Sequence, residues 1–453
     1  MGLESWWGFY QSTCPTQMGL SLNIGTSHET TGSIGSEMIS GSDSQSSSSS
    51  SSKCSSMRSS NADHAAEEHR CVAILHGHEG NVISLALAGD MLYSGSDRGD
   101  IQAWKNNPQF RKAKRFGSGE GSVKSLVVVD DKVISAHQDC KIRVWRKSKG
   151  KSNRLHQLVI SMPSMKAFLI NFLTPNNNYV QVRRQREKAL WTDHHDVISV
   201  LAVGTDVLYS GSWDKSIKVW SLSDFKCLES LTSHIDAVNA LAVDRKRGLL
   251  YSGSADATIK VWQRRYSNLL ATHTLITTLE EAKKSPVNAL ALSPDAEILY
   301  SGASNKTITV WKRLELRGGH KHVVPAGLLR GHRLAVLCLS TIADLLISGS
   351  ADKTIRIWRR GATDGLHSCV SLLQGHKGPV KSLCTSAGTT RMGFMVYSGS
   401  MDCDVRVWWI PPDQEREAEN LTSDGSQESP PPSVRWSNNN NHHPSNMMSL
   451  PSL

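Results

Sequence analysis

The sequence has no run approaching the roughly 18 apolar residues that a membrane-spanning helix needs. Its first residues, MGLESWWGFY, lack the basic region and apolar stretch of a secretory signal. We therefore expect neither a membrane span nor export.

Paired cysteines are also missing. The nine cysteines form no C-x-x-C pair, and most stand singly in apolar runs, such as Cys338 in AVLCLS. This pattern predicts reduced, buried thiols rather than disulfides or a zinc site. We expect no metal and no cofactor.

Motifs of nucleotide binding and catalysis are absent as well. The segment GSGEGSVK (117–124) fails the G-x-G-x-x-G pattern because Ser122 stands in the third glycine position. There is no P-loop, no kinase HRD or DFG set, and no G-x-S-x-G elbow. The sequence therefore predicts a protein that is not an enzyme.

What the sequence has is an internal repeat. Seven segments place a serine ten residues before a tryptophan, and all but one of the steps between tryptophans fall near 40 to 50 residues. The segments are SGSDRGDIQAW (94–104), SAHQDCKIRVW (135–145), SGSWDKSIKVW (210–220), SGSADATIKVW (252–262), SGASNKTITVW (301–311), SGSADKTIRIW (348–358) and SGSMDCDVRVW (398–408).

Each unit also reads as short strands separated by turn residues, for example 335–340, 344–350 and 354–358. One such sheet cannot bury both faces, so stacking around a ring supplies the core. The units resemble the WD40 family, and the resemblance implies an all-β, seven-bladed propeller. We place this propeller at residues 70–410.

The resemblance also implies a buried hydrogen-bonded relay of histidine, serine, aspartate and tryptophan in each complete blade. A catalytic triad is needed once, in a cleft beside an oxyanion hole, whereas these sets recur around a ring. We therefore interpret the sets as structural. The complete sets are His234, Ser252, Asp256 and Trp262; His332, Ser348, Asp352 and Trp358; and His376, Ser398, Asp402 and Trp408.

The other blades depart from this pattern. In blade 1, Arg98 stands where an aspartate is expected, and in blade 3, His194 and His195 lie slightly out of register. Blade 2 has Asp139 but no histidine in its entry loop. Blade 5 has Asn305 for the aspartate and also lacks a histidine, so we expect incomplete relays in these four blades.

Ring closure is predicted from the two ends of the repeat. After Trp408, Pro411 and Pro412 oppose a further strand, so blade 7 lacks its outer strand. The apolar segment CVAILH (71–76) precedes blade 1. We expect it to pair with residues 405–409 and thereby remove an exposed sheet edge.

Both flanks have the composition of disordered chain. Residues 1–69 include the Ser-rich stretch 42–56, and residues 411–453 include PPP and NNNN runs with no strand pattern. Phosphorylation of the serines would add charge that binds or releases a partner, whereas an inert solubilising tail is the simpler alternative.

A basic insertion lies between blades 2 and 3. Residues 146–190 hold ten basic residues and one acidic residue, a local charge of +9 in a chain of +10. Arg183, Arg184 and Arg186 are candidate partner contacts. The segment 163–175 has a helical apolar face, which either packs on the propeller or docks a partner. Few aromatics accompany these charges, so nucleic acid is not the expected partner.

The loop that carries the relay aspartate offers a second candidate contact. The residue before that aspartate is expected to be exposed, and it is Trp213 in blade 3 and Met401 in blade 7. Tryptophan is enriched in interaction hot spots. Packing of Trp213 against a neighbouring loop is the alternative.

A Ser-rich leader, seven repeats, and an insertion reading NYVQVRR (178–184) before LW (190–191) resemble the plant JINGUBANG-type WD40 proteins. The resemblance implies a non-enzymatic regulator in the cytoplasm and nucleus. We expect the chain to be monomeric outside its complexes. The resemblance further implies restraint of pollen germination and tube growth through a TCP-type transcription factor. A substrate receptor of a ubiquitin ligase is the alternative, although no terminal tryptophan is followed by the aspartate of the W-D-x-R signature.

Overall fold

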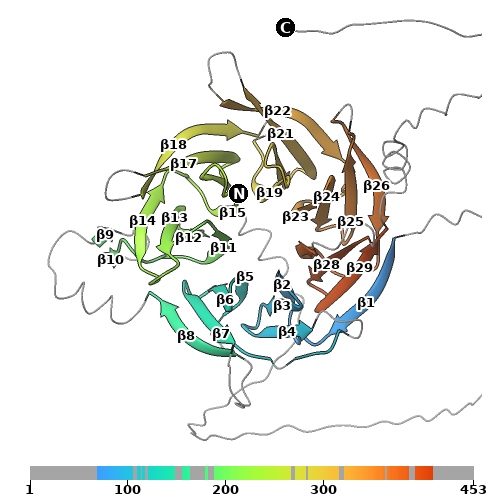
Figure 1. The fold of residues 1–453 in the computed structure, drawn as a ribbon, viewed down its shortest axis with the longest axis horizontal. Helices are drawn as coiled ribbons and strands as arrows, with labels where there is room; N and C mark the ends of the chain where they lie inside the picture. Colours follow the sequence, from blue (N-terminus) through green and yellow to red (C-terminus); the bar gives the residue numbers. More distant parts are fainter. Residues whose placement is uncertain are drawn as a thin grey trace, which may run out of the picture.

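The computed structural model describes residues 69–411, apart from 106–109, 114, 118–120, 148–155, 164–178, 182–187, 267–270, 282–283, 316–320, 363–364 and 387–392. Within this part, seven antiparallel sheets surround one axis and form a seven-bladed β-propeller (Figure 1). The predicted all-β fold is confirmed. The described residues contain no helix that is both long and apolar enough to cross a membrane.

Each blade runs outward from the axis in chain order. The inner strands are β2 (Val82–Ala88), β5 (Val123–Val129), β11 (Ile198–Val203), β15 (Val238–Asp244), β19 (Val287–Leu292), β23 (Val336–Ile342) and β27 (Val380–Thr385). The second strands are β3 (Met91–Ser96), β6 (Lys132–His137), β12 (Val207–Ser212), β16 (Leu249–Ser254), β20 (Ile298–Ala303), β24 (Leu345–Ser350) and β28 (Phe394–Ser400).

The repeat tryptophans lie on the third strands, which are β4 (Ile101–Lys105), β7 (Ile142–Lys147), β13 (Ser216–Ser221), β17 (Thr258–Tyr266), β21 (Thr307–Glu315), β25 (Ile355–Arg360) and β29 (Asp404–Ile410). The outer strands of blades 2 to 6 are β8 (His156–Met162), β14 (Cys227–Thr232), β18 (Ala271–Glu280), β22 (Lys321–Arg330) and β26 (His367–Leu373). In blade 1 the outer position is irregular, with single bridges from β4 to Lys112 and Phe116.

The ring closes as predicted. Strand β1 (Arg70–His76) precedes blade 1 in the chain, yet it pairs antiparallel with β29 as the outer strand of blade 7 (Figure 1). Both ends of the repeat therefore belong to one sheet, and unfolding of either end opens the ring. His76 adds a side-chain contact, since its Nδ1 lies 2.6 Å from Asp404 Oδ1.

The glycine of the S-G-S pattern explains how neighbouring blades fit together. A Cβ atom at Gly253 would lie 2.6 Å from Cγ1 of Val287, the first residue of the next inner strand. The same approach recurs between blades 7 and 1, where Gly399 faces Val82 at 2.7 Å. These distances are too short for a real Cβ, so glycine allows the apolar faces of adjacent sheets to pack closely.

Tyrosines on the second strands add polar contacts between blades. The Tyr209 hydroxyl lies 2.9 Å from Nε2 of His273 in the next blade, and Tyr93 and Tyr300 contact His156 and His367 in the same way at 3.2 and 2.8 Å. Burial and the interaction with Lys147 lower the pKa of His156 to about 4. The His156 imidazole is therefore neutral in the fold at pH 7.

Part of the insertion forms a small hairpin of β9 (Tyr179–Gln181) and β10 (Lys188–Leu190), which lies outside the ring of sheets (Figure 1). Most of the proposed helix 163–175 lies outside the described residues, as do Arg183, Arg184 and Arg186 and nearly all of the tails at 1–69 and 411–453. The cysteines correct one expectation: Cys338 is buried, but Cys71 and Cys369 are exposed.

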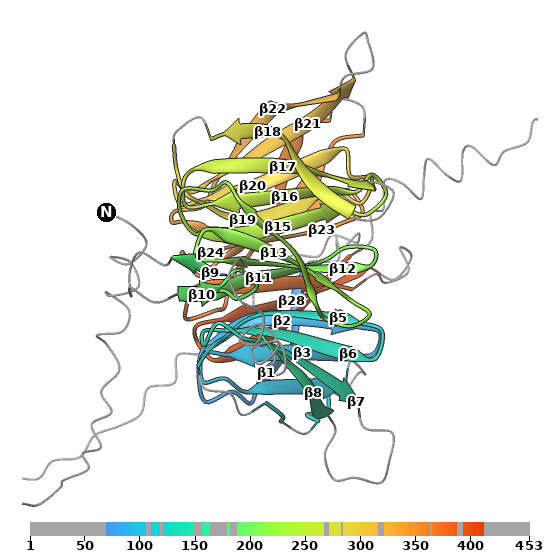
Figure 2. The same cartoon turned by 90° about the vertical axis from the view of Figure 1, so that its left-hand side faces the viewer.

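The propeller has two faces, and its strands run between them (Figure 2). We call one the loop face, because it carries the loops that enter each inner strand and the turns between second and third strands. The opposite turn face carries the other turns. Inner strands are tied together near the loop face, where Asn239 and Asn288 donate to the carbonyls of Val287 and Val336 at 3.1 and 3.0 Å.

Candidate interaction faces and the buried polar network

A tryptophan–serine hydrogen bond lies inside every blade. Each repeat tryptophan donates its indole N–H to the serine ten residues earlier, over 2.8 or 2.9 Å. All seven serines are fully buried. The hydrogen bond joins the second strand to the third and gives the constant ten-residue spacing its physical cause.

Blade 4 shows the complete relay. His234 Nδ1 lies 2.8 Å from Asp256 Oδ2, and its Nε2 lies 2.8 Å from Ser252 Oγ. If Asp256 accepts from Nδ1–H, Nε2 accepts from the serine hydroxyl, whose oxygen accepts from Trp262. Burial opposes ionisation of Asp256, but its hydrogen bonds to His234 and Thr258 hold the pKa of this carboxyl well below its usual range.

The other two predicted sets have the same geometry. In blade 6, His332 lies 3.0 Å from Asp352 and 2.8 Å from Ser348. In blade 7, His376 lies 2.8 Å from Asp402 and 2.7 Å from Ser398. Trp358 and Trp408 complete these relays, so each of the twelve residues of the three sets takes part in a relay hydrogen bond.

Blade 1 corrects the sequence interpretation. Neither Arg98 nor Asp97 completes its relay; Asp100 does, lying 3.0 Å from Nδ1 of His78. Asp100 stands two places later than the usual aspartate, and the tight turn brings its carboxylate to the same point. Although burial opposes ionisation, hydrogen bonds from His78 and Ser96 lower the pKa of Asp100 to about 2.

Blade 3 is a second correction. His194 is in register, because its Nδ1 lies 2.8 Å from Asp214 and its Nε2 lies 2.8 Å from Ser210. The separation from His194 to Ser210 is 16 residues, the same as from His332 to Ser348. This shared separation is the signal in the sequence that identifies His194 as the relay histidine.

Blades 2 and 5 replace the loop histidine by other means. In blade 2, His137 follows Ser135 on the same strand and its Nε2 lies 2.8 Å from the serine hydroxyl, while Asp139 pairs with Arg143 instead. Burial and Arg143 lower the pKa of His137 to about 4. In blade 5, buried Glu281 accepts hydrogen bonds from Ser301 and Thr309.

The burial of the relay residues determines whether they can react with a substrate. Ser348 is fully buried and His332 is 6% exposed, so a substrate cannot reach the pair without opening the blade. The described residues hold no group of three or more His, Cys, Asp or Glu placed to bind a metal ion. The relays satisfy polar groups inside the sheets.

The relay aspartates also fix the loop face. Asp256, Asp352 and Asp402 each accept the backbone N–H of the residue that follows the relay histidine, at 2.8 to 3.1 Å. Those residues are Ile235, Arg333 and Lys377, which are all exposed, and Ile235 is 77% exposed. Each relay therefore holds one projecting side chain on a rigid loop.

Trp213 and Met401 lie on the loop face, but both are half-buried. The Lys124 ammonium group lies 5.8 Å from the centroid of the Trp213 ring, which places this tryptophan across the boundary between blades 2 and 3. Their backbone N–H groups bond Val197 and Pro379 at 3.0 and 2.9 Å. The contact with Lys124 supports the packing alternative for part of the indole, and the remaining surface stays accessible.

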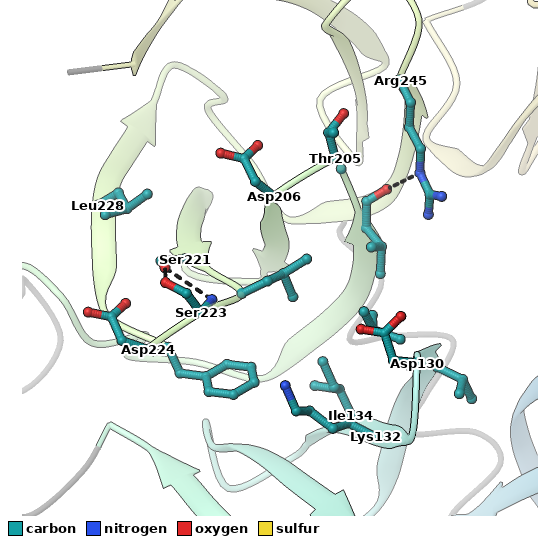
Figure 3. Close-up of a pocket in the computed structure, with 16 residues that line it drawn as sticks. Asp130, Lys132, Ile134, Thr205, Asp206, Ser221, Ser223, Asp224, Leu228 and Arg245 are labelled. Carbon is teal, nitrogen blue, oxygen red and sulfur yellow. Dashed lines mark hydrogen bonds between the residues drawn. The ribbon is translucent and has the colours of Figure 1, made fainter. Parts of the chain in front are cut away.

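The turn face has a cavity of about 760 Å³ between blades 2 and 3 (Figure 3). Asp130 and Lys132 lie on its blade 2 side, with Asp206 and Leu228 on the blade 3 side. Its lining mixes charge, hydroxyls and apolar surface, and Arg264 compensates Asp206. No histidine or cysteine lines it, so it offers space for a side chain without an evident nucleophile or base.

These features define a propeller whose buried polar groups hold its own strands and loops together. A family model for the WD domain, G-beta repeat, matches residues 69–105, 187–221, 225–263, 273–312, 324–359 and 367–408. The chain therefore belongs to the WD40-repeat family, whose fold is typically a non-catalytic scaffold. Most of blade 2 lies between matched segments, in agreement with its altered relay. A model of the Argonaute linker 1 domain matches residues 1–30, outside the described residues.

The curated relatives share part of this chain. Zinc finger CCCH domain-containing protein 17 of rice is 28% identical over 202 residues, covering 36% of this chain and 39% of the relative. Zinc finger CCCH domain-containing protein 59 of Arabidopsis thaliana is 25% identical over 176 residues, covering 36% of each. An uncharacterised WD repeat-containing protein of Schizosaccharomyces pombe is 43% identical over 60 residues, covering 12% of each. The chain thus spans less than two fifths of these proteins.

Proposed function

We propose that this chain is a non-enzymatic scaffold that binds protein partners on its loop face. The observation that carries the proposal is the anchoring of exposed loop residues by buried relays. Rigid loops lose little conformational entropy on binding, so their contacts contribute more fully to affinity. The WD40 fold supports a scaffold function in general.

We further propose that this scaffold is a regulator of the JINGUBANG type that acts in the cytoplasm and nucleus. This proposal rests on the Ser-rich leader and on NYVQVRR (178–184), and it includes restraint of pollen germination through a TCP-type transcription factor. Arg183, Arg184 and Arg186 remain candidate contacts of the insertion. Copurification with a cullin complex would instead support the ubiquitin-ligase receptor.

Trp213 is the residue with which to test the loop face. Replacing Trp213 with Ala in the full chain should weaken capture of the partner by about 2 kcal/mol, close to thirtyfold, because a large aromatic contact is lost. The measurement is quantitative affinity capture from cells, followed by titration of the captured protein against both chains.

The matched control is Leu366→Ala, which removes a side chain that is 68% exposed on the turn face. This variant should bind as the original chain does, and neither substitution should shift thermal unfolding by more than a few degrees. Equal capture by all three chains, or a large loss of stability in Trp213→Ala, would contradict the role of Trp213 as a partner contact.

A further inference from the structure

Charge is segregated between two halves of the loop face. In the described loops of blades 5, 6 and 7, every exposed charged residue is a cation: Lys284, Lys306, Arg333, Lys353 and Lys377. We call these five residues the basic sector. The insertion still accounts for +9 of the net charge of +10, because carboxylates elsewhere in the chain offset these five cations.

The carboxylates of the same loops are already engaged. Glu281 is buried against Ser301 and Thr309, and Asp352 and Asp402 bind the relay histidines. Half-buried Asp404 at the start of β29 is engaged by His76. No side chain of the basic sector has an ion pair with another described residue. At the outer rim, exposed Glu280 and Arg330 end β18 and β22 and add no net charge.

The loops of blades 1 to 4 have the opposite arrangement. Outside the relays, their carboxylates are exposed Glu79 and Asp236 and half-buried Asp97, Asp139, Asp193 and Asp196. Cations stand among them, and Arg98 lies 3.3 Å from Glu79. This half of the face is therefore mixed in charge, while the exposed charged residues of the described loops in the other half are all cations.

The basic sector is built on fixed backbone. The N–H groups of Arg333 and Lys377 each bond a relay aspartate at 2.8 Å. Lys306 and Lys353 occupy left-handed positions, with φ of 73° and 70°, in the tight turns that follow β20 and β24. The backbone positions of these four residues are therefore well defined, although their side chains extend into solvent.

Two further lysines, Lys381 and Lys124, stand near the start of inner strands at the loop face. Lys381 follows the first residue of β27, the position that Asn239 and Asn288 occupy in their inner strands. Burial lowers the pKa of Lys381, and burial together with the nearby Lys381 lowers the pKa of Lys124 to about 8. The charge of Lys381 thus acts on Lys124, and an anion bound near both lysines would stabilise their charged forms.

We propose that the basic sector binds an acidic segment of a protein partner, with carboxylate side chains placed between the loops of blades 5, 6 and 7. This inference rests on the proposed scaffold function and names the chemistry of its partner. Charge complementarity of this kind chiefly determines specificity and the rate of association.

An acidic peptide fits better than a nucleic acid. Binding of single strands uses aromatic side chains on which bases stack, and the described loops of this sector contain no tryptophan, tyrosine or phenylalanine. A long phosphate chain would also leave the sector and meet the carboxylates of blades 1 to 4. A short acidic segment avoids both problems.

The test uses the full chain and a fluorescein-labelled peptide of alternating glutamate and serine, measured by fluorescence anisotropy at low ionic strength. Reversing two charges, Lys353→Glu with Lys377→Glu, should weaken binding about tenfold or more, and added salt should weaken binding to the original chain. A glutamine–serine peptide should bind neither chain.

The matched control reverses Lys141 and Lys215, which lie in the equivalent turns of blades 2 and 3; φ of Lys215 is 74°, against 70° for Lys353. This control should change affinity less than twofold. Equal losses in both variants, no binding of the glutamate peptide, or tighter binding of a single-stranded RNA of similar charge would each overturn the inference. The scaffold function fails separately, if the full chain captures no protein partner from cells.

Discussion

Blades 4 and 2 solve the same structural problem with different residues. Both place a buried serine against the indole N–H of the repeat tryptophan. Blade 4 continues from the serine through His234 to Asp256, which reaches the backbone of the entry loop. Blade 2 stops at His137, and its Asp139 turns to Arg143.

This difference separates two roles within one network. The tryptophan–serine bond holds the strands together and is present in all seven blades. The aspartate fixes the entry loop, and blade 2 lacks that link. Entry loops held by a relay aspartate are therefore found where the relay is complete, as at Ile235, Arg333 and Lys377.

Removing the histidine from each blade should give the largest difference. His234→Ala leaves the Asp256 carboxylate, whose side chain is 2% exposed, without its imidazole partner and should destabilise the fold by about 3–5 kcal/mol. His137→Ala removes one hydrogen-bond partner of the Ser135 hydroxyl, which keeps its bond from Trp145, and should cost about 1–3 kcal/mol. Urea unfolding of both variants measures the two losses.

The surface variant Leu366→Ala serves as a reference for these measurements and should change stability by less than about 0.5 kcal/mol. Equal losses for the two histidine variants would mean that the aspartate contributes nothing beyond the serine contact. The separate roles assigned to blades 2 and 4 would then be wrong.

Blades 2 and 4 should lose their contributions to stability over different pH ranges as the pH is lowered. The pKa of His137 is about 4 in the folded chain and 6.5 in the unfolded chain. Between these pH values the unfolded chain therefore binds a proton that the folded chain does not. Stability should therefore fall as pH decreases from about 6.5 to 4, by up to about 3 kcal/mol. Asp256 has a lowered pKa, and its contribution is lost only as pH falls below about 3.8.

His137→Gln removes the titrating group of blade 2 and should flatten the loss of stability between about pH 6.5 and 4.5, with His156 accounting for much of what remains. Urea midpoints at several pH values measure this effect. An unchanged pH slope in His137→Gln would show that His137 is protonated in the fold or stays neutral when unfolded.

Much of the fold could be predicted from sequence because its signal repeats. The ten-residue step from serine to tryptophan marks two adjacent strands in every blade, and the apolar segment 71–76 identified the strand that closes the ring. Three complete relays followed from residue identity, because His332, Ser348 and Asp352 hold the positions that the pattern requires.

The residues that replace the usual relay histidine or aspartate could not be predicted from the repeat pattern. Asp100, His137 and Glu281 reach the relay position from different places in the chain, and only three-dimensional packing brings them to the serine. The basic sector was missed for a related reason. Its five cations are spread over about a hundred residues of sequence and meet only when three blades stand side by side.

The glycine after the serine gives the smallest and most local comparison. Blade 4 has Gly253, where a Cβ would lie 2.6 Å from Val287 Cγ1, whereas blade 2 has Ala136 at the same position, packed with Ile198. Gly253→Ala should cost about 1–3 kcal/mol through overpacking between blades 4 and 5. Gly327→Ala in β22 is the control, since its Cβ would meet no atom closer than 3.9 Å. If Gly253→Ala proves as stable as Gly327→Ala, adjacent blades can separate by a few tenths of an ångström, and the glycine reflects backbone preference rather than packing.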